Sequence, residues 1–152
     1  MHAIARQESS FHAKIAAYDG GLGFMQLMPK HIISTAKKIN IVLDMNKIKD
    51  MNYNIQLGSF YLQDHVEKFK SCLLAIYSYN CGRKRLLQYT KIFGDFHLVN
   101  DDMKILSAME KFPVNISREY GKRVWSNYMI YLILTQGKID FSNMKLNQIV
   151  PF

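Results

Sequence analysis

The chain has 152 residues, 49% of them hydrophobic, which is enough apolar material for one domain with a real core. Its formal net charge of +8 favours an anionic partner, such as nucleic acid, an acidic membrane surface or a polymer that carries carboxylates. Two cysteines exclude a disulfide framework, and the longest strongly apolar run, residues 128–134, is too short to span a bilayer.

The predicted elements are helical throughout, because no segment alternates convincingly between polar and apolar residues and the chain has only three prolines. We predict a first helix over residues 1–10, a loop over 11–22 and a short helix over 24–28. Pro29 suits the first turn of the helix that follows. Later helices are predicted at residues 30–39, 52–69, 71–80, 83–90, from 101 to before Pro113, and 115–136. The predicted fold class is all-α.

Particular residues are expected to end or begin these helices. Gly82 suits the C-terminal cap of the fourth long helix, and Asn115 is predicted as the N-cap of the last one. The connections are predicted at residues 44–50 and 91–100. We expect one domain over residues 1–136, followed by a C-terminal tail over residues 137–152.

The first helix carries a candidate acid. Helical spacing puts Ile4, Glu8 and Phe11 on one face, so Glu8 interrupts an apolar stripe. Removing a carboxyl group from water raises its pKa, and such a group can act as a general acid near neutral pH. The alternative is a partly exposed glutamate near a helix end.

A glycine-rich loop follows this helix. Gly20, Gly21 and Gly23 allow the backbone to turn sharply and to approach a ligand closely. The loop leads into the apolar residues 24–28, which include one amide, Gln26. It is not a phosphate-binding loop, because no Gly-Lys-Ser/Thr follows the glycines. We interpret the helix, loop and apolar segment as a groove wall that contains one acid.

Metal and nucleic-acid sites are not expected. The five histidines show no spacing typical of a metal site, and neither cysteine belongs to a zinc motif. Cys72 lies in an apolar run and is expected to be a buried thiol. The densest basic cluster, Arg83-Lys84-Arg85, is not accompanied by a nucleic-acid-binding motif, so solvated surface is the expected role of most basic residues. We therefore predict no metal, no cofactor and no nucleic-acid partner.

Five motifs in order along residues 3–131 resemble the catalytic domain of soluble lytic transglycosylases, a family with a goose-type-lysozyme-like fold. The resemblance implies a lysozyme-like helical domain with a substrate groove. It rests on five stretches of the sequence. The first combines Ala3-Ile4-Ala5-Arg6-Gln7-Glu8-Ser9 with Gly23-Phe24-Met25-Gln26-Leu27-Met28-Pro29. The others are Asn54-Ile55-Gln56-Leu57-Gly58-Ser59-Phe60-Tyr61-Leu62, Ser78-Tyr79-Asn80-Cys81-Gly82, Glu110-Lys111-Phe112-Pro113 and Arg118-Glu119-Tyr120.

The resemblance implies that Glu8 is catalytic and that the glycine loop binds substrate. Gln26 would hydrogen-bond a sugar or the acid, and the alternative is a solvated polar residue. Phe24 and Met25, next to Gly23, would line the sugar subsites, although such residues at helical spacing are more often core; for Met25 we weigh the two equally. Ser9 follows the acid as in the family, and its alternative role is only to finish the helix.

Four residues further along the chain match other motifs of the family. Tyr79 and Asn80 match a motif opposite the acid, where the hydroxyl would contact Glu8 or substrate and the amide would anchor backbone. A satisfied core tyrosine is the alternative. Glu110 matches a glutamate of the family's cleft, whereas without the resemblance it is expected on the surface. For Tyr120, structural packing is at least as probable as a substrate role.

The activity that the resemblance implies is lytic cleavage of peptidoglycan. Glu8 would protonate the oxygen between N-acetylmuramic acid and N-acetylglucosamine, and the muramyl N-acetyl oxygen would stabilise the developing cation. The Glu8 carboxylate would then accept the proton of the 6-hydroxyl, which closes onto C1 to form a 1,6-anhydro product. No water is consumed.

Other functions remain open at this point. A lysozyme-type hydrolase of the same fold would need a second carboxylate or another water-orienting group near Glu8, and Asp19 is the only candidate near it in sequence. A peptidoglycan-binding remnant without turnover is another, because Ala17 replaces a serine present in many members and the chain is N-terminally short. A basic DNA-binding helical domain is the least favoured.

The sequence says less about the cellular location and the oligomeric state of the protein. The first residues do not form a signal peptide, whereas the family works in the periplasm or cell envelope. The sequence does not determine the oligomeric state, the preferred stem peptide, or whether cleavage starts at strand ends.

Overall fold

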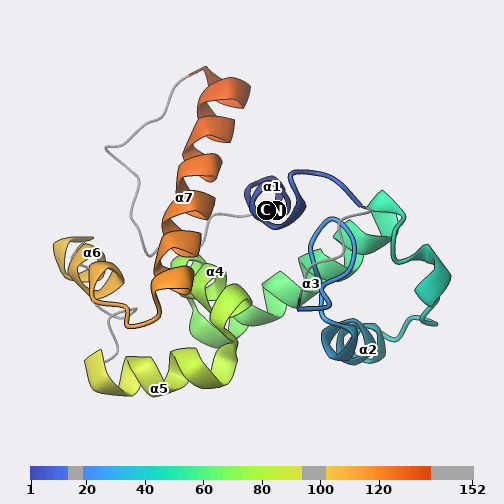
Figure 1. Cartoon of the computed structure of the whole chain (residues 1–152), viewed down its shortest axis with the longest axis horizontal. Coiled ribbons are helices and arrows are strands. Elements are labelled where there is room, and N and C mark those ends of the chain that lie inside the picture. The colour runs from blue at the N-terminus through green and yellow to red at the C-terminus, as the bar shows by residue number, and fades with distance from the viewer. Residues whose placement is uncertain (14–18, 94–101, 138–152) are drawn as a thin grey trace. The chain divides into compact units, whose positions relative to one another are not determined.

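The computed structural model describes residues 1–13, 19–93 and 102–137, and this part of the chain is built from helices. They are α1 (His2–Ser9), α2 (Pro29–Lys38), α3 (Met51–Phe69), α4 (Cys72–Cys81), α5 (Arg83–Phe93), α6 (Asp102–Glu110) and α7 (Asn115–Gln136), with a 3-10 turn, η1, at Met45–Lys47 (Figure 1). The all-α prediction is confirmed. The chain divides into two compact units, Met1–Gln63 and Asp64–Phe152.

The predicted helix boundaries agree with the structure at most places. Pro29 begins α2, and Gly82 is the C-terminal cap of α4 with φ 81°. The prediction for the start of α7 is wrong by one residue: Val114 is the N-cap, and Asn115 instead accepts a hydrogen bond from Arg118 Nη2 at 2.6 Å. The predicted connection at residues 91–100 begins too early, since α5 continues to Phe93; its other residues lie outside the described part.

The first unit places α1, the glycine loop and α2 with most of α3. Its buried core includes Ile4 of α1, Leu27 of the loop, Ile32 of α2 and Leu57 of α3. Two carboxylates cap helix starts in this unit: Asp44 Oδ1 accepts from Asn46 N of η1 at 3.0 Å, and Asp50 Oδ1 accepts from Tyr53 N of α3 at 2.9 Å. These caps satisfy backbone donors that the first turns leave without a helical acceptor.

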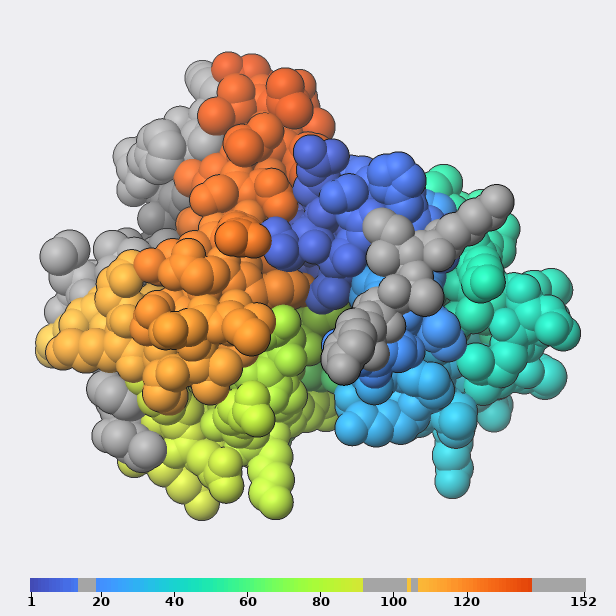
Figure 2. All heavy atoms as spheres, in the orientation of Figure 1, coloured from blue at the N-terminus to red at the C-terminus, as the bar shows by residue number. Residues whose placement is uncertain are grey.

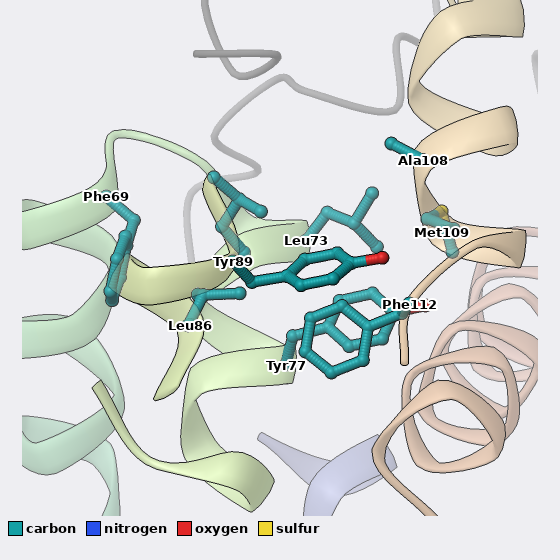
Figure 3. Packing of buried hydrophobic residues seen from close by; sticks show 9 residues of the cluster. Phe69, Leu73, Tyr77, Leu86, Tyr89, Ala108, Met109 and Phe112 are labelled. Carbon is teal, nitrogen blue, oxygen red and sulfur yellow. The ribbon is translucent and has the colours of Figure 1, made fainter. Parts of the chain in front are cut away.

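The second unit is held together by an aromatic and aliphatic cluster between α4, α5 and α6, shown in Figure 3. The Phe112 ring lies 4.9 Å from Tyr77 and 4.5 Å from Tyr89, the latter edge-on, which are favourable aromatic separations. The cluster contains Phe69, Leu73, Leu74, Tyr77, Leu86, Tyr89, Ala108, Met109 and Phe112.

Helix α7 packs against α4 at a position that requires a glycine. A Cβ atom at Gly121 would lie 2.5 Å from Cζ of Tyr77, so only glycine allows this approach. In Figure 2 the coloured atoms of α6 lie next to those of α7 on the surface of this unit. No helix of the described residues is long and apolar enough to cross a membrane.

Two tyrosines of the same cluster make a matched stability test. Tyr89 donates a hydrogen bond to the Lys111 carbonyl, whereas the buried Tyr77 hydroxyl has no hydrogen-bond partner among the described residues. We expect Tyr89→Phe to lower the free energy of unfolding by about 1 kcal/mol, and Tyr77→Phe to leave it unchanged or raise it. Urea unfolding of both variants measures the difference; equal losses would contradict this account.

Candidate active site

Glu8 lies in the last turn of α1 and is half-buried. Ile4, one turn earlier, is buried, as the predicted stripe requires. Phe11 does not continue that stripe: Ser10 and Phe11 have φ values of 50° and 64°, so the chain leaves the helix before Phe11, whose side chain is 37% exposed. The apolar surroundings of Glu8 therefore come from fewer helix residues than the sequence predicted.

The segment 24–28 is a tight turn, and the prediction of a short helix there is wrong. Leu22 and Leu27 exchange backbone hydrogen bonds of 3.0 and 3.1 Å across an antiparallel bridge. Gly23 has φ 73° and Gln26 has φ 47°, both in the left-handed region. The Gly23 carbonyl accepts from the Gln26 backbone N–H at 3.2 Å and from Gln26 Nε2 at 2.7 Å. The turn thus fixes the half-buried Gln26 side chain against Gly23.

Ser9 connects α1 to this turn. Its buried hydroxyl lies 2.8 Å from the Phe24 carbonyl oxygen and 3.2 Å from the Ala5 carbonyl oxygen. The first contact fixes the residue next to Glu8 to the glycine loop, and the second, longer contact lies within α1, which agrees with the alternative role of Ser9 in finishing the helix. Ser9 therefore positions the backbone at Glu8.

Residues 24–26 of the loop differ in burial. Phe24 and Gln26 are half-buried. Met25 is completely buried and packs on α3, where a Cβ atom at Gly58 would lie 2.6 Å from Met25 Cγ. Of the two interpretations of Met25, burial favours packing over direct contact with a sugar.

The remaining candidate residues lie in the second unit. Tyr79 is half-buried, and its ring centroid is 6.2 Å from that of the buried His65. Asn80 is exposed, and its Oδ1 accepts from Ser117 Oγ at 2.6 Å, so it joins α4 to α7. Tyr120 is buried in α7, which agrees with a packing role.

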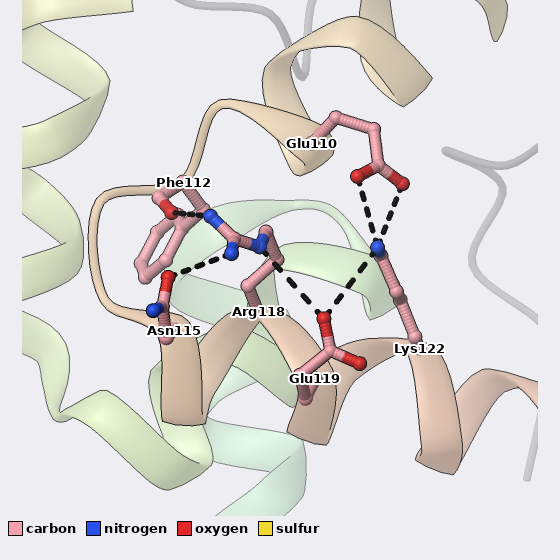
Figure 4. Close-up of polar contacts among 6 residues, drawn as sticks. All are labelled: Glu110, Phe112, Asn115, Arg118, Glu119 and Lys122. Carbon is pink, nitrogen blue, oxygen red and sulfur yellow. Dashed lines mark hydrogen bonds and ion pairs between the residues drawn. The ribbon is translucent and has the colours of Figure 1, made fainter.

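Glu110 belongs to an exposed charged network between α6 and α7, drawn in Figure 4. Lys122 Nζ lies 2.8 and 2.9 Å from the two Glu110 oxygens and 3.6 Å from Glu119 Oε1. The hydrogen bond to Glu110 is the main cause that raises the pKa of Lys122. Arg118 donates to the Phe112 carbonyl at 3.1 Å and so fixes the turn between the two helices.

The structure brings Glu8, Ser9 and residues 22–27 together in the first unit, and it adds one residue that sequence reasoning had not selected for the site. Asn54 is completely buried in α3; its Oδ1 accepts from Met25 N at 2.8 Å, and its Nδ2 donates to the Leu22 carbonyl at 3.1 Å. Its place at the start of the motif Asn54–Gly58, at helical spacing from the apolar Leu57 and Tyr61, is the sequence signal that could have identified it.

The structure also describes Asp19 and the two cysteines, which the sequence raised as candidates for other chemistry. Asp19 is exposed and its Oδ1 accepts from Gly21 N at 3.2 Å, while Ala17 lies outside the described residues. Cys72 is a buried thiol, as predicted, and is not part of a disulfide. Burial raises the pKa of Cys81 to about 11, so this thiol stays protonated and is not a nucleophile at neutral pH. The described residues contain no group of three or more His, Cys, Asp or Glu side chains suited to a metal ion.

Solved structures of lytic transglycosylases are similar to this chain. An inactive mutant of lytic transglycosylase Slt from Pseudomonas aeruginosa superposes with a TM-score of 0.80 at 27% identity, over 99% of this chain and 24% of that chain. A 70-kDa soluble lytic transglycosylase in complex with bulgecin A superposes with a TM-score of 0.76 at 25% identity, over 97% of this chain and 22% of that chain.

Sequence comparisons point the same way. The soluble lytic murein transglycosylase of Escherichia coli K12 is 30% identical over 127 residues, which are 80% of this chain and 18% of the relative. This chain thus spans less than a fifth of that relative's length. Residues 1–98 match the family model described as the Transglycosylase SLT domain. The chain therefore belongs to the Transglycosylase SLT domain family.

Proposed function

We propose that this chain is a peptidoglycan lytic transglycosylase domain. It cleaves the β-1,4 bond between N-acetylmuramic acid and N-acetylglucosamine and forms 1,6-anhydromuramic acid. Family membership and the names of the relatives support this activity. The proposed domain covers residues 1–136, and its proposed binding partner is the peptidoglycan glycan strand.

The placement of Glu8 is the observation that carries the proposal. The chain has four glutamates, and Glu67, Glu110 and Glu119 are exposed. Glu8 alone is half-buried, one residue from the Ser9 contact that holds the glycine loop. The Pseudomonas relative is inactive after replacement of one glutamate by glutamine, so that glutamate is essential in that protein. By placement, Glu8 is the candidate for that role here.

The proposed mechanism uses Glu8 twice. As an acid it donates a proton to the glycosidic oxygen, and the muramyl N-acetyl oxygen stabilises the cation at C1. As a carboxylate it then accepts the proton of the 6-hydroxyl, whose oxygen bonds to C1. A half-buried position suits both steps, because partial exclusion of water favours the protonated acid and limits hydrolysis.

The surrounding residues have separate proposed roles. Phe24 and Gln26, both half-buried on the loop, contact sugar rings by packing and by hydrogen bonding. The loop that carries Phe24 and Gln26 is held in place by Met25, Gly23 and Ser9. We propose that Tyr79 contacts substrate, that Asn80 and Tyr120 hold α4 and α7 in place, and that Glu110 contributes to binding through its exposed carboxylate.

A lysozyme-type hydrolase is the competing function. It requires a carboxylate or another group that orients water near Glu8. Asp19, the nearest in sequence, is exposed and its carboxylate caps the Gly21 N–H. This contact favours a structural role for Asp19 in the loop.

The proposed location is the periplasm or the cell envelope. The relatives are named soluble lytic murein transglycosylases, and this name supports a location at the cell wall.

The principal test is mass spectrometry of muropeptides released from purified peptidoglycan by the parent protein and by Glu8→Gln. We expect 1,6-anhydromuramic products from the parent and at least about 100-fold less from Glu8→Gln, because general acid–base catalysis contributes that much. Glu67→Gln, an exposed glutamate of α3, is the matched control and should retain full activity.

Two outcomes of that experiment would contradict the proposal. Products with reducing-end muramic acid would indicate a lysozyme-type hydrolase. No release by a folded parent protein that still sediments with peptidoglycan would indicate a binding domain without turnover.

Bulgecin A provides a test of the binding site that does not depend on turnover. It forms a complex with a relative of similar fold, so we expect it to bind this chain and to raise the melting temperature. A ligand at 100 times its Kd stabilises the folded state by about 2.7 kcal/mol. The measurement is a thermal-unfolding titration, with Phe24→Ala expected to weaken binding; an unchanged melting temperature at saturating bulgecin would contradict the expectation.

A further inference from the structure

One peptide group of the glycine loop is held at both of its polar atoms. The carbonyl oxygen of Phe24 accepts the hydrogen bond from Ser9 Oγ at 2.8 Å. The N–H of the same peptide bond, that of Met25, donates to Asn54 Oδ1 at 2.8 Å. The Phe24–Met25 peptide therefore connects the end of α1 to the first turn of α3 through two short hydrogen bonds.

The Asn54 side chain is fixed on its other side as well. Its Nδ2 donates to the Leu22 carbonyl at 3.1 Å, and the residue has no exposed surface. Gly23 lies against the Asn54 amide, because a Cβ atom at that position would overlap the amide and would lie 2.7 Å from the Ile48 carbonyl oxygen. Asn54 therefore has one orientation, set by two backbone partners and by a glycine that leaves room for it.

We propose that Asn54 is a positioning residue for Glu8. The inference rests on the proposed function, in which Glu8 is the acid and base. Asn54 sets the plane of the Phe24–Met25 peptide, this plane sets where the Phe24 oxygen lies, and the oxygen holds Ser9, the residue next to Glu8. Because misplacement of a reacting group by about 1 Å can cost about 100-fold in rate, the hydrogen bonds of Asn54 affect catalysis without contact with substrate.

A purely space-filling role for Asn54 makes a different prediction. Leucine has nearly the shape of asparagine but neither accepts nor donates a hydrogen bond, whereas aspartate keeps the oxygen that accepts from Met25 N. If Asn54 only fills volume, Asn54→Leu will be tolerated at least as well as Asn54→Asp. If its polar atoms position the loop, the order will be reversed.

The experiment compares the steady-state kinetics of four proteins on uncross-linked glycan strands: the parent, Asn54→Leu, Asn54→Asp and Asn52→Leu. Asn52 is an exposed asparagine of the same helix and is the matched control. We expect Asn54→Leu to lower kcat by about 100-fold with KM changed less than about threefold, and Asn54→Asp to recover part of that loss. Asn52→Leu should match the parent.

A double mutant tests the connection through the shared peptide. Ser9→Ala should also lower kcat, and Ser9→Ala with Asn54→Leu should be no slower than the slower single variant, because both changes release the same peptide group. Losses that multiply, or a folded Asn54→Leu with kcat within about twofold of the parent, would overturn the proposal.

Amide NMR separates this inference from the proposed function. In Asn54→Leu we expect faster hydrogen exchange at Met25 N–H and shifted amide resonances at Glu8 and Ser9, whether or not the protein cleaves peptidoglycan. Unchanged Met25, Glu8 and Ser9 resonances would overturn the inference, whereas a parent without 1,6-anhydro products would overturn only the proposed function. If Asn54→Leu does not fold, Asn54→Asp decides the question, because it loses the donor to the Leu22 carbonyl and is expected to shift the amide resonances of Glu8 and Ser9.

Discussion

Gly23 and Asn54 approach each other so closely that no side chain fits between the loop and α3. The first unit depends on this approach. It allows one asparagine to satisfy two backbone groups of the loop, and it leaves the Phe24 carbonyl in reach of Ser9. One turn later in α3, Gly58 also allows a close approach, because its missing side chain leaves room for Met25. Backbone N–H and carbonyl groups are costly to bury without hydrogen-bond partners. Here the Met25 N–H and the Leu22 and Phe24 carbonyls have partners, and these hydrogen bonds attach the loop to α1 and α3.

The second unit obtains its rigidity in another way. Its core is a cluster in which Phe112, from the turn after α6, lies between the rings of Tyr77 and Tyr89. Arg118 of α7 holds the Phe112 carbonyl from outside. The exposed pair of Glu110 with Lys122 adds little stability by itself, as is usual for solvated ion pairs, so the aromatic cluster is the main support of α6.

The helices were largely predictable because periodic apolar residues, Pro29 and Gly82 are local signals. The turn at residues 24–28 was not, because its conformation depends on Asn54, about 30 residues later. The burial of Met25 likewise depends on the missing side chain at Gly58. Local motifs were enough to identify Glu8, Ser9 and the loop. The contact between Asn80 and Ser117 was not predictable, because it depends on how α4 and α7 pack, and no local sequence pattern determines that packing.

The two cysteines lie at opposite ends of α4, which bears on how the chain responds to oxidation. Nine residue steps along the helix separate Cys72 from Cys81 by about 13 Å along the axis, from the rise per residue. A disulfide needs Cα atoms within about 7 Å, so the folded chain cannot close one between them. An oxidising compartment would therefore not link the two cysteines of one molecule to each other, and α4 would need no reducing environment to keep its shape.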